Sequence, residues 1–298
     1  MANAREIQSR MKSIKDTMKI TNAMYMISSS KLKKAKKNLA DTEPYFYAMQ
    51  GEISRILRHV PEMENKYFDV RTNIKPEDKR IGYIVVTADK GLAGSYNHNI
   101  FKEVEECLQQ NPNTKLFVVG EMGRQYFKKK GLKVSHQFHY TAQNPTVGRA
   151  RNIAELVINQ FLEHKVDEVI MIYTRMVNSM QVESERVKLL PLVKQEFNTV
   201  KIPTGVRQEA LILSPSAEDV INNIIPNYIQ GFIYGALVES FSSEQNLRMM
   251  AMQAATNSAQ AMLHDLSIQY NRVRQAAITQ EITEVVAGAK AQKKKKKK

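Results

Sequence analysis

One loop has the position that a phosphate-binding loop takes in α/β proteins. Residues Thr87-Ala-Asp-Lys-Gly-Leu-Ala-Gly-Ser-Tyr-Asn97 follow an expected strand and precede an expected helix. The loop lacks the Gly-Lys-Ser/Thr ending of a Walker loop and the three-glycine dinucleotide pattern. The other reading is a tight turn in which Gly91 and Gly94 allow a positive φ and close packing. We favour the turn and expect no nucleotide-binding residues, and an α/β enzyme that uses this loop is the alternative.

The other side chains that perform chemistry are few or scattered. The single cysteine, Cys107, excludes an internal disulfide and a four-cysteine metal site. No histidine pair has the i, i+4 helical spacing of a zinc site, and the nucleophile pattern Gly-x-Ser-x-Gly is absent. We therefore expect no catalytic residue, no metal site and no cofactor. The histidines are His59, His98, His136, His139, His164 and His264.

The positive charge of the chain is concentrated at its two ends. The 298 residues carry 44 basic and 30 acidic side chains, a formal net charge of +14. Residues 1–40 hold ten basic and two acidic residues, and residues 290–298 hold seven lysines and no acid. Such a basic stripe could bind nucleic acid, but Tyr25 is the single aromatic in residues 1–40, so a stacking platform is missing. A nucleic-acid-binding coiled coil is therefore the second alternative, and an acidic protein partner is a third reading of the lysines.

Residues 3–58 are expected to form one long helix. Neither Gly nor Pro occurs before Pro44, and two seven-residue series interleave at spacings of three and four over five repeats. This heptad pattern is a strong coiled-coil signal. Pro61 should end the helix, which gives an N-terminal coiled-coil helix over residues 1–60. The two series are Ala4, Met11, Met18, Tyr25, Leu32 and Leu39, and Ile7, Ile14, Thr21, Ser28 and Ala35.

The middle of the chain, residues 76–213, changes to short apolar runs that alternate with helical segments. This alternation predicts an inserted α/β domain with a small Rossmann-like sheet. The expected strands are 80–87, 115–120, 166–173 and 182–190, and the expected helices are about 98–110, 121–130 and 146–164.

A second long helix is expected over residues 214–289, with Ser216 as its cap. The second helix would extend about 110 Å and the first, residues 3–58, about 80 Å. No globular core accommodates helices of these lengths. We therefore expect the N- and C-terminal helices to pair as an antiparallel coiled coil, with the α/β domain inserted between them. The lysine tail, 290–298, should be disordered through self-repulsion. The expected contact positions of the second helix are Ala259, Met262, Leu266, Gln269, Val273, Ala276, Gln280 and Thr283.

Four segments together resemble the gamma subunit of F-type ATP synthases. They lie in the order of that family between residues 2 and 291. The segments are Lys19-Ile-Thr-Asn-Ala-Met-Tyr-Met26 followed by Ser30-Lys31; Thr87-x-Asp89-x-Gly91-Leu92-x-Gly94-x-x-Asn97; Ser243-Glu244-Gln245 with Arg248-Met249-x-Ala251-Met252-x-x-Ala255-Thr256; and Ile278-Thr279-x-Glu281-x-x-Glu284-x-x-x-Gly288-Ala289-x-Ala291.

The resemblance implies a mechanical role. In that family the paired terminal helices form a bent central shaft inside a ring of three alpha and three beta subunits. Rotation driven by the ion-translocating membrane ring, the c-ring, changes the three catalytic sites in turn. The inserted α/β domain is similar to the foot that docks epsilon and rests on the c-ring. The resemblance thus implies a non-catalytic rotor subunit that couples ion transport to ATP synthesis or hydrolysis.

The resemblance also implies contact positions and a location. The small apolar end Val285-Val-Ala-Gly-Ala289 is similar to the tip that turns in an apolar sleeve of the ring. No run of about 18 apolar residues, secretory signal or transit peptide is evident, so we expect a peripheral subunit at the cytoplasmic face of a bacterial cell membrane. We expect neither membrane insertion nor a nucleic-acid partner. The implied contacts with the catalytic ring are Met24, Lys31, Lys33, Lys34, Arg274, Gln275 and Thr279.

Overall fold

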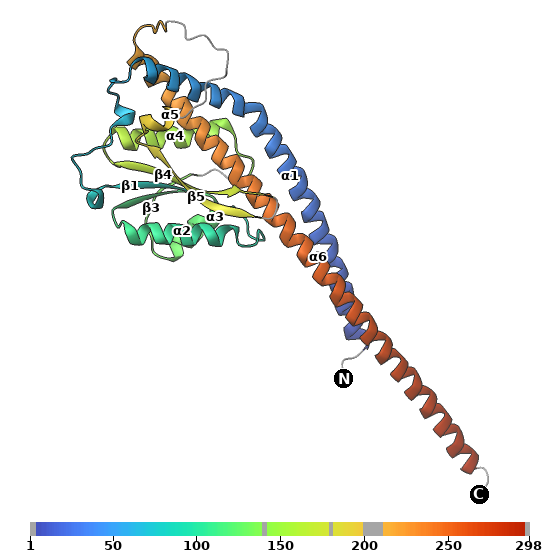
Figure 1. The fold of residues 1–298 in the computed structure, drawn as a ribbon. Helices are drawn as coiled ribbons and strands as arrows, with labels where there is room; N and C mark the ends of the chain where they lie inside the picture. Colours follow the sequence, from blue (N-terminus) through green and yellow to red (C-terminus); the bar gives the residue numbers. More distant parts are fainter. Residues whose placement is uncertain (1–3, 139–141, 179–180, 199–210, 296–298) are drawn as a thin grey trace. The chain divides into compact units, whose positions relative to one another are not determined.

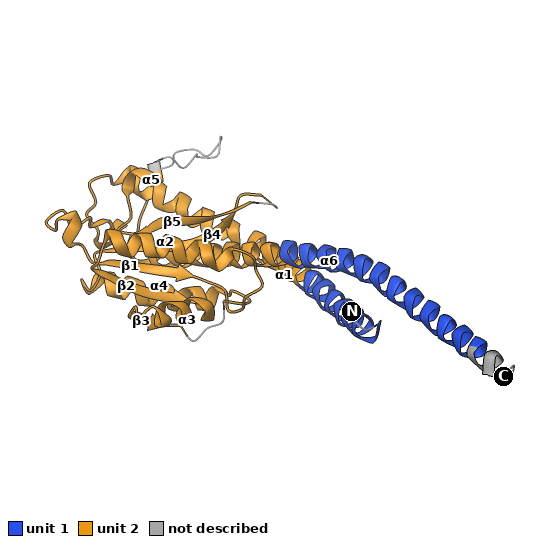
Figure 2. Ribbon diagram, turned by 90° about the horizontal axis from the view of Figure 1, so that it is seen from below, with its two compact units in different colours: residues 1–27, 249–298 blue, residues 28–248 orange. Residues whose placement is uncertain are grey.

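The computed structural model describes residues 4–138, 142–178, 181–198 and 211–295 (Figure 1). The chain divides into two compact units, which Figure 2 distinguishes. We call residues 1–27 with 249–298 the helix-pair unit and residues 28–248 the sheet unit. The elements in chain order are α1 (Ala4–His59), η1 (Lys66–Phe68), η2 (Pro76–Asp78), β1 (Ile81–Val86), α2 (Tyr96–Gln110), β2 (Thr114–Val119), α3 (Glu121–Lys129), β3 (Val134–Gln137), α4 (Val147–Leu162), β4 (Glu168–Met176), β5 (Val182–Leu190), α5 (Lys194–Asn198) and α6 (Ala217–Lys295).

The sheet unit is built around five strands in the order β3-β2-β1-β4-β5. Strand β1 pairs in parallel with β2 and with β4, and β2 pairs in parallel with β3. Strand β5 is antiparallel to β4 and forms one edge. The expected Rossmann-like α/β fold with long helices is therefore confirmed. Strand β3 and helix α5 were not expected from the sequence.

Alternate residues of each central strand supply two cores on opposite faces of the sheet. Ile84 and Val86 of β1 pack with the apolar side of α4 and with α1 and α6. Tyr83 and Val85 pack with α2 and with Phe127 of α3. The sheet is thus a middle layer, because side chains of a strand alternate in direction and both faces here are covered by helices (Figure 1).

The heptad pattern of α1 is confirmed by burial. Every position of the two seven-residue series is buried or half-buried. In the helix-pair unit, Ile7 is 4% exposed and Thr21 is 8% exposed. Thr21 Oγ1 lies 2.7 Å from Thr256 Oγ1 of α6, so the two helices meet along this series. The helix continues through Pro44 to His59, which agrees with the expected end before Pro61.

The contact series of α6 differs from expectation at five of its eight positions. Ala259, Leu266 and Val273 are buried or half-buried as expected. Met262, Gln269, Ala276, Gln280 and Thr283 are exposed, so these five expected contacts are wrong. The series that alternates with Ala259 and Leu266 lies one residue later, because Leu263 offers an apolar side chain next to Met262. The positions at spacings of three and four that are buried or half-buried are Met252, Thr256, Ala259, Leu263, Leu266, Tyr270 and Val273. Met249, Ala251 and Ser267 are half-buried as well.

Both ends of α6 can be traced to the sequence. Ser216 Oγ accepts a hydrogen bond from the Asp219 backbone N–H at 3.1 Å, which confirms the expected cap. The helix runs on to Lys295, beyond the expected end at 289. Lysine is a good helix former, and cations are favourable near a helix C-terminus. The rest of the lysine tail lies outside the described residues.

Candidate functional site where the strands end

The sheet has a topological switch point between β1 and β4. The connections from β1 to β3 place α2 and α3 on one face, and the next connection places α4 on the other. Ligands of open α/β sheets bind in the crevice at the carboxyl ends of the strands at such a point. Here the loop Thr87–Asn97 lies at this position, directly after β1.

A polar segment of α6 occupies this crevice. Glu239 Oε1 accepts a hydrogen bond from the Met176 backbone N–H at 2.9 Å. Ser240 Oγ accepts from the Thr174 N–H at 3.4 Å, and Ser243 Oγ donates to the Thr174 carbonyl at 3.3 Å. The end of β4 is thus bonded to helix side chains. The buried polar residues of this segment are Ser240, Ser242, Ser243, Glu244, Gln245, Asn246 and Arg248.

Tyr96 connects the start of α2 to the same segment. Its hydroxyl lies 2.6 Å from Ser240 Oγ, and the residue is 1% exposed. Burial raises the pKa of the Tyr96 hydroxyl, with a further contribution from Glu244, so the hydroxyl stays protonated. A buried hydroxyl with a hydrogen-bond partner holds two elements together at little cost.

Arg248 binds the loop Thr87–Asn97, which has the position of a phosphate-binding loop. Its Nη2 donates to the carbonyl oxygens of Gly91 at 3.1 Å and Lys90 at 3.4 Å. It also donates to Glu244 Oε1 at 2.6 Å. Burial raises the pKa of Glu244, and the Arg248 charge opposes this rise. The loop therefore presents carbonyl oxygens to a guanidinium group, which is the opposite of the N–H groups that bind phosphate.

The remaining loop residues bind the sheet unit internally. Asn97 Oδ1 accepts from the Ala88 N–H at 3.0 Å. Thr87 Oγ1 donates to the Val119 carbonyl at 2.8 Å and accepts from the Gly123 N–H at 3.1 Å. A side chain at Gly120 could not fit, because a Cβ there would overlap Thr87 O. These bonds make the loop a rigid docking element for α6.

At the amino ends of the strands, Asp167 and Arg71 form a buried ion pair. Asp167, 1% exposed, lies before β4 and accepts from Arg71 Nη1 at 2.5 Å and Arg80 Nε at 2.9 Å. Arg71 also donates to the carbonyls of Val166 at 2.6 Å and Phe161 at 2.5 Å. Burial alone would raise the pKa of Asp167, but the hydrogen bonds from Arg80 and Arg71 hold it well below its usual range. This cluster anchors the segment after η1 to the sheet.

Comparison with known proteins identifies the family of the chain. The family model described as ATP synthase matches residues 3–292. The ATP synthase gamma chain of Ruminiclostridium cellulolyticum is 46% identical over 291 residues, which cover 97% of this chain and 98% of the relative. The chain belongs to the ATP synthase gamma chain family. The resemblance found in the sequence is therefore confirmed, and the chain is part of a membrane-associated ATPase complex.

Solved structures of ATP synthases contain chains of similar fold. A chain from the Tetrahymena thermophila mitochondrial ATP synthase structure of the central stalk and c-ring has a TM-score of 0.59 and 27% identity. The match covers 79% of this chain and 99% of that one. A chain from the Euglena gracilis mitochondrial ATP synthase has a TM-score of 0.65 at 15% identity, with 97% and 94% coverage, and shares the fold.

Two family motifs that the sequence showed separately meet in the sheet unit. The Thr87–Asn97 motif and the Ser243–Arg248 motif are joined by the hydrogen bonds of Arg248. Tyr96 of the first motif also contacts Ser240, which lies one turn before the second. Neither this pairing nor the Arg71 cluster was expected from the sequence. One signal was available, since a run of Ser, Glu, Gln and Asn within an otherwise apolar helix marks a buried polar contact.

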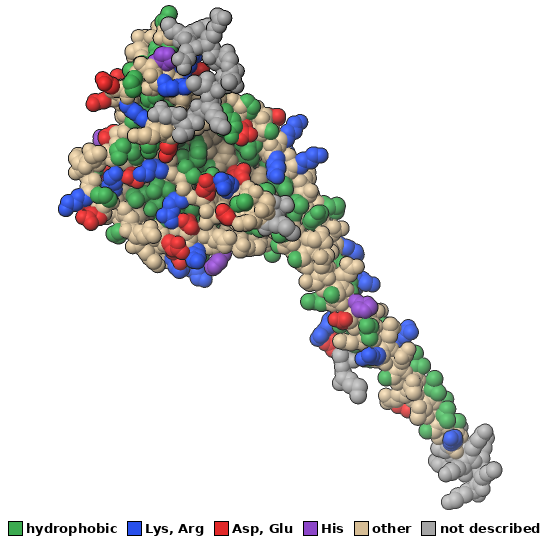
Figure 3. All heavy atoms as spheres, viewed as in Figure 1, with side chains coloured by type: hydrophobic (Ala, Val, Ile, Leu, Met, Phe, Trp, Pro, Cys, Tyr) green, Lys and Arg blue, Asp and Glu red, His purple; other side chains and the backbone are tan. Residues whose placement is uncertain are grey.

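The contact residues implied by the resemblance lie in both units. Met24 in the helix-pair unit is half-buried. Lys31 in the sheet unit is half-buried, and Lys33 and Lys34 are exposed (Figure 3 shows basic side chains along α1). Thr279 Oγ1 donates to the Gln275 carbonyl one turn earlier, at 2.9 Å. Three residues of the implied set, Arg274, Gln275 and Thr279, are exposed on α6 after Val273, its last half-buried described residue.

Two further properties concern ions and membranes. Within the described ranges, no cluster of three or more His, Cys, Asp or Glu side chains is arranged to hold a metal ion. His139 lies outside those ranges. A search of the same residues finds no helix that is both long and apolar enough to span a membrane.

Proposed function

We propose that this gamma-family chain is the central-stalk rotor subunit of an F-type ATP synthase. It couples rotation of the ion-translocating c-ring to ATP synthesis or hydrolysis in a ring of three alpha and three beta subunits. Its partners are the alpha, beta and epsilon subunits and the c-ring. The chain carries no catalytic residue itself, and it lies as a peripheral subunit at the cytoplasmic face of the bacterial cell membrane. Membership of the family is the main support.

The observation that carries the proposal is the unpaired end of α6 in the helix-pair unit. After Val273, every described side chain of α6 up to Lys290 is exposed. Apolar side chains recur there on an otherwise polar helix, and Figure 3 shows apolar surface along this part. Exposed apolar groups in such a row mark a surface that a partner covers. The exposed apolar residues are Ile278, Ile282, Val285 and Val286.

The proposed contacts with the catalytic ring suit a shaft whose surface moves past the alpha and beta subunits as it turns. Lys33, Lys34 and Arg274 are exposed and charged, and such contacts with acidic loops are individually weak. Weak charged contacts can form and break as a shaft turns, whereas deep apolar docking would resist rotation. Met24, Lys31, Gln275 and Thr279 complete the proposed set.

Reconstitution tests the proposal directly. The full chain is mixed with purified alpha and beta subunits, followed by size-exclusion chromatography and an ATPase assay. We expect one large complex with a single copy of this chain and hydrolysis that is faster and cooperative. A chain that elutes alone, with activity equal to that of alpha and beta without it, would contradict the rotor role.

The proposed contacts are tested in the same assay. Lys33→Ala combined with Lys34→Ala should lower ATPase activity of the complex several-fold, because two exposed cations are removed from the proposed ring contact. Lys128→Ala combined with Lys129→Ala removes two exposed lysines from α3 and serves as the matched control. Equal activity of the two double variants would remove the lysines from the contact set.

A further inference from the structure

A cavity of about 380 Å³ lies in the sheet unit between α1, α6 and the end of β4. This volume is within the range of small-molecule sites. Its walls come from residues 39–50 of α1, residues 228–239 of α6 and two residues of β4. None of the groups that join the loop Thr87–Asn97 to Arg248 lines it.

Two glycines of α6 shape the cavity. A Cβ at Gly231 would overlap the ring of Phe46, so α1 and α6 approach closely at that level. One turn later, a Cβ at Gly235 would meet no atom within 4 Å. Gly235 lines the cavity, so the space beside it is open to an added group. The helices are therefore close at one level and leave room at the next.

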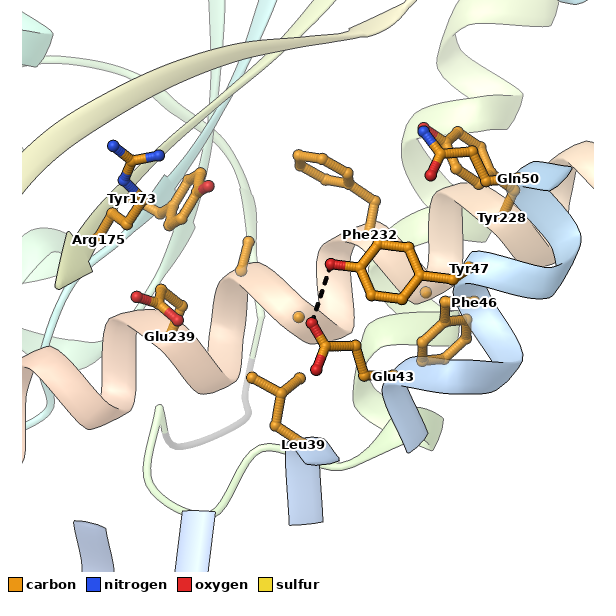
Figure 4. A pocket seen from close by; sticks show the side chains of 13 residues that line it. Leu39, Glu43, Phe46, Tyr47, Gln50, Tyr173, Arg175, Tyr228, Phe232 and Glu239 are labelled. Atoms are coloured by element: carbon orange, nitrogen blue, oxygen red, sulfur yellow. Dashed lines mark hydrogen bonds between the residues drawn. The ribbon is translucent and has the colours of Figure 1, made fainter. Parts of the chain in front are cut away.

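The walls of the cavity are mainly aromatic. Phe46 and Tyr47 come from α1, Tyr228 and Phe232 from α6, and Tyr173 from β4. Figure 4 shows Tyr47 between Phe46 and Phe232, with its hydroxyl directed toward Glu43. The hydroxyl donates to Glu43 Oε1 at 3.0 Å, which fixes the ring at the opening. Faces of aromatic rings attract cations, especially organic cations with an apolar surface.

Carboxylates determine the charge of the cavity. Glu43 of α1 and Glu239 of α6 both line it and are half-buried. The one cationic lining residue, Arg175, lies beside Tyr173 in Figure 4 and is 3.4 Å from Glu185 Oε2. The lining therefore carries an excess of negative charge, beside rings that also favour cations.

We propose that this cavity binds a small organic cation, an alkylated ammonium group attached to an apolar body. The ammonium group lies against Tyr47 and Phe232 and between the carboxylates of Glu43 and Glu239. The apolar body packs against Leu39 and occupies the open space beside Gly235. Such a ligand contacts α1 and α6 at once and stabilises their contact in the sheet unit. This site is independent of the proposed rotor contacts.

The test is isothermal titration of the full chain with phenyltrimethylammonium, with tert-butylbenzene as its uncharged isostere. We expect saturable binding with a dissociation constant below about 1 mM and at least about tenfold weaker binding of the isostere. Glu43→Gln should weaken binding several-fold, and Gly235→Leu should abolish it by filling the space. Glu52→Gln, an exposed glutamate of α1 outside the cavity, is the matched control and should bind as the unchanged chain does.

Each outcome decides the proposal. Absence of saturable binding up to about 10 mM, or equal binding of the uncharged isostere, would overturn it. Unchanged affinity in Gly235→Leu would also overturn it, because the cation would then bind elsewhere. Circular dichroism of each variant shows whether the fold is retained. A correctly folded Glu43→Gln that binds as tightly as Glu52→Gln would exclude the carboxylate from the site.

Discussion

The sheet unit adds buried, paired charges to its two apolar cores, whereas the helix-pair unit joins its helices through apolar contacts and a pair of threonine hydroxyls. Asp167 with Arg71, and Glu244 with Arg248, are each 9% exposed or less. In the helix-pair unit, Thr21 meets Thr256, and apolar side chains such as Ile7 and Ala259 are buried. The two units therefore differ in the buried ion pairs that only one of them adds to apolar packing among the described residues.

This difference separates a rigid joint from an adaptable surface. Removing one partner of a buried ion pair is costly, because the other charge remains without compensation. A helix contact made of small and apolar residues spreads its stabilisation over many weak interactions. We therefore expect single substitutions to have large effects in the sheet unit and small effects in the helix-pair unit.

The largest effect is expected for Asp167→Ala. Arg71 is 5% exposed and would keep its charge without a carboxylate partner, so the free energy of unfolding should fall by about 4 kcal/mol. Urea denaturation followed by circular dichroism measures this loss. Glu163→Ala removes the partner of Lys165 in an exposed pair and should change stability by less than about 1 kcal/mol. Similar losses in both variants would contradict the role of burial.

The same cluster predicts a pH dependence. The pKa of Asp167 in the folded chain lies below that in the unfolded chain, so its contribution is present above the usual carboxyl pKa. Stability should then fall as the pH decreases below about 4 and more of the unfolded chain binds a proton. Asp167→Ala should show a shallower decrease over this range. An unchanged slope would show that other carboxyl groups cause the acid sensitivity.

The next largest effect is expected for Gly120→Ala. Gly120 has φ +97°, and its Cβ would overlap Thr87 O at the carboxyl end of β1. The backbone must shift, so we expect a loss of about 3 kcal/mol in the free energy of unfolding. Gly131→Ala is the control, because Gly131 also has a positive φ, +74°, but has no atom within 4 Å of the added Cβ. It should lose only about 1 kcal/mol from backbone strain.

The elements that the sequence predicted well are those with repeated local patterns. The heptad pattern of α1 continues over five repeats, and every expected position is buried or half-buried. Three apolar runs correspond to β1, β2 and β4, and the further expected strand 182–190 corresponds to β5. Repetition averages over single ambiguous residues, which is why these long patterns determine the structure.

The missed features depend on contacts between distant residues. Strand β3 spans four residues, Val134–Gln137, and its pattern is too short to be recognised. Arg71 meets Asp167 across 96 positions of sequence. In α6, Met262 and Leu263 are adjacent and equally apolar, so only the position of α1 selects Leu263. The predicted ring contacts have no intramolecular signature of this kind, since their partners are other subunits.

A smaller effect is expected for Arg248→Met. The variant leaves Glu244, 1% exposed, without its 2.6 Å partner and frees the carbonyls of Lys90 and Gly91. We expect a loss of about 2 kcal/mol in the free energy of unfolding. Adding Glu244→Gln should restore part of it, because the buried charge is then absent.

The pH dependence of Arg248→Met has the opposite sign to that of Asp167. Burial already raises the pKa of Glu244, and loss of Arg248 removes the opposing charge. A carboxyl group with a raised pKa in the folded chain favours folding at low pH and loses this contribution as the pH rises. The variant should therefore be less destabilised at about pH 5 than at about pH 8. Equal losses at both pH values would show that Glu244 is not the group affected.

The smallest effect is expected in the helix-pair unit, for Thr21→Val and Thr256→Val. Each hydroxyl lies near a carbonyl of its own helix, Met18 for Thr21 and Met252 for Thr256, and the two hydroxyls are 2.7 Å apart. Each hydroxyl has a single hydrogen, so one must donate to the other while the second donates to its own helix. Either single variant leaves the remaining hydroxyl without a partner on the other helix. The free energy of unfolding should therefore fall by about 1 kcal/mol.

The double variant distinguishes a hydrogen bond from simple packing. With both hydroxyls replaced by methyl groups of similar shape, no polar group is left unpaired, so the loss should be smaller than the sum of the single losses by about 0.5–1 kcal/mol. Hydrogen exchange of peptides from residues 4–27 and 249–273 measures the effect on this contact. Thr17→Val, at an exposed threonine whose hydroxyl donates to the Ser13 carbonyl at 2.9 Å, controls for the change in helix propensity. Additive losses would mean that the helices are held by shape alone, and the contrast between the two units would then be greater still.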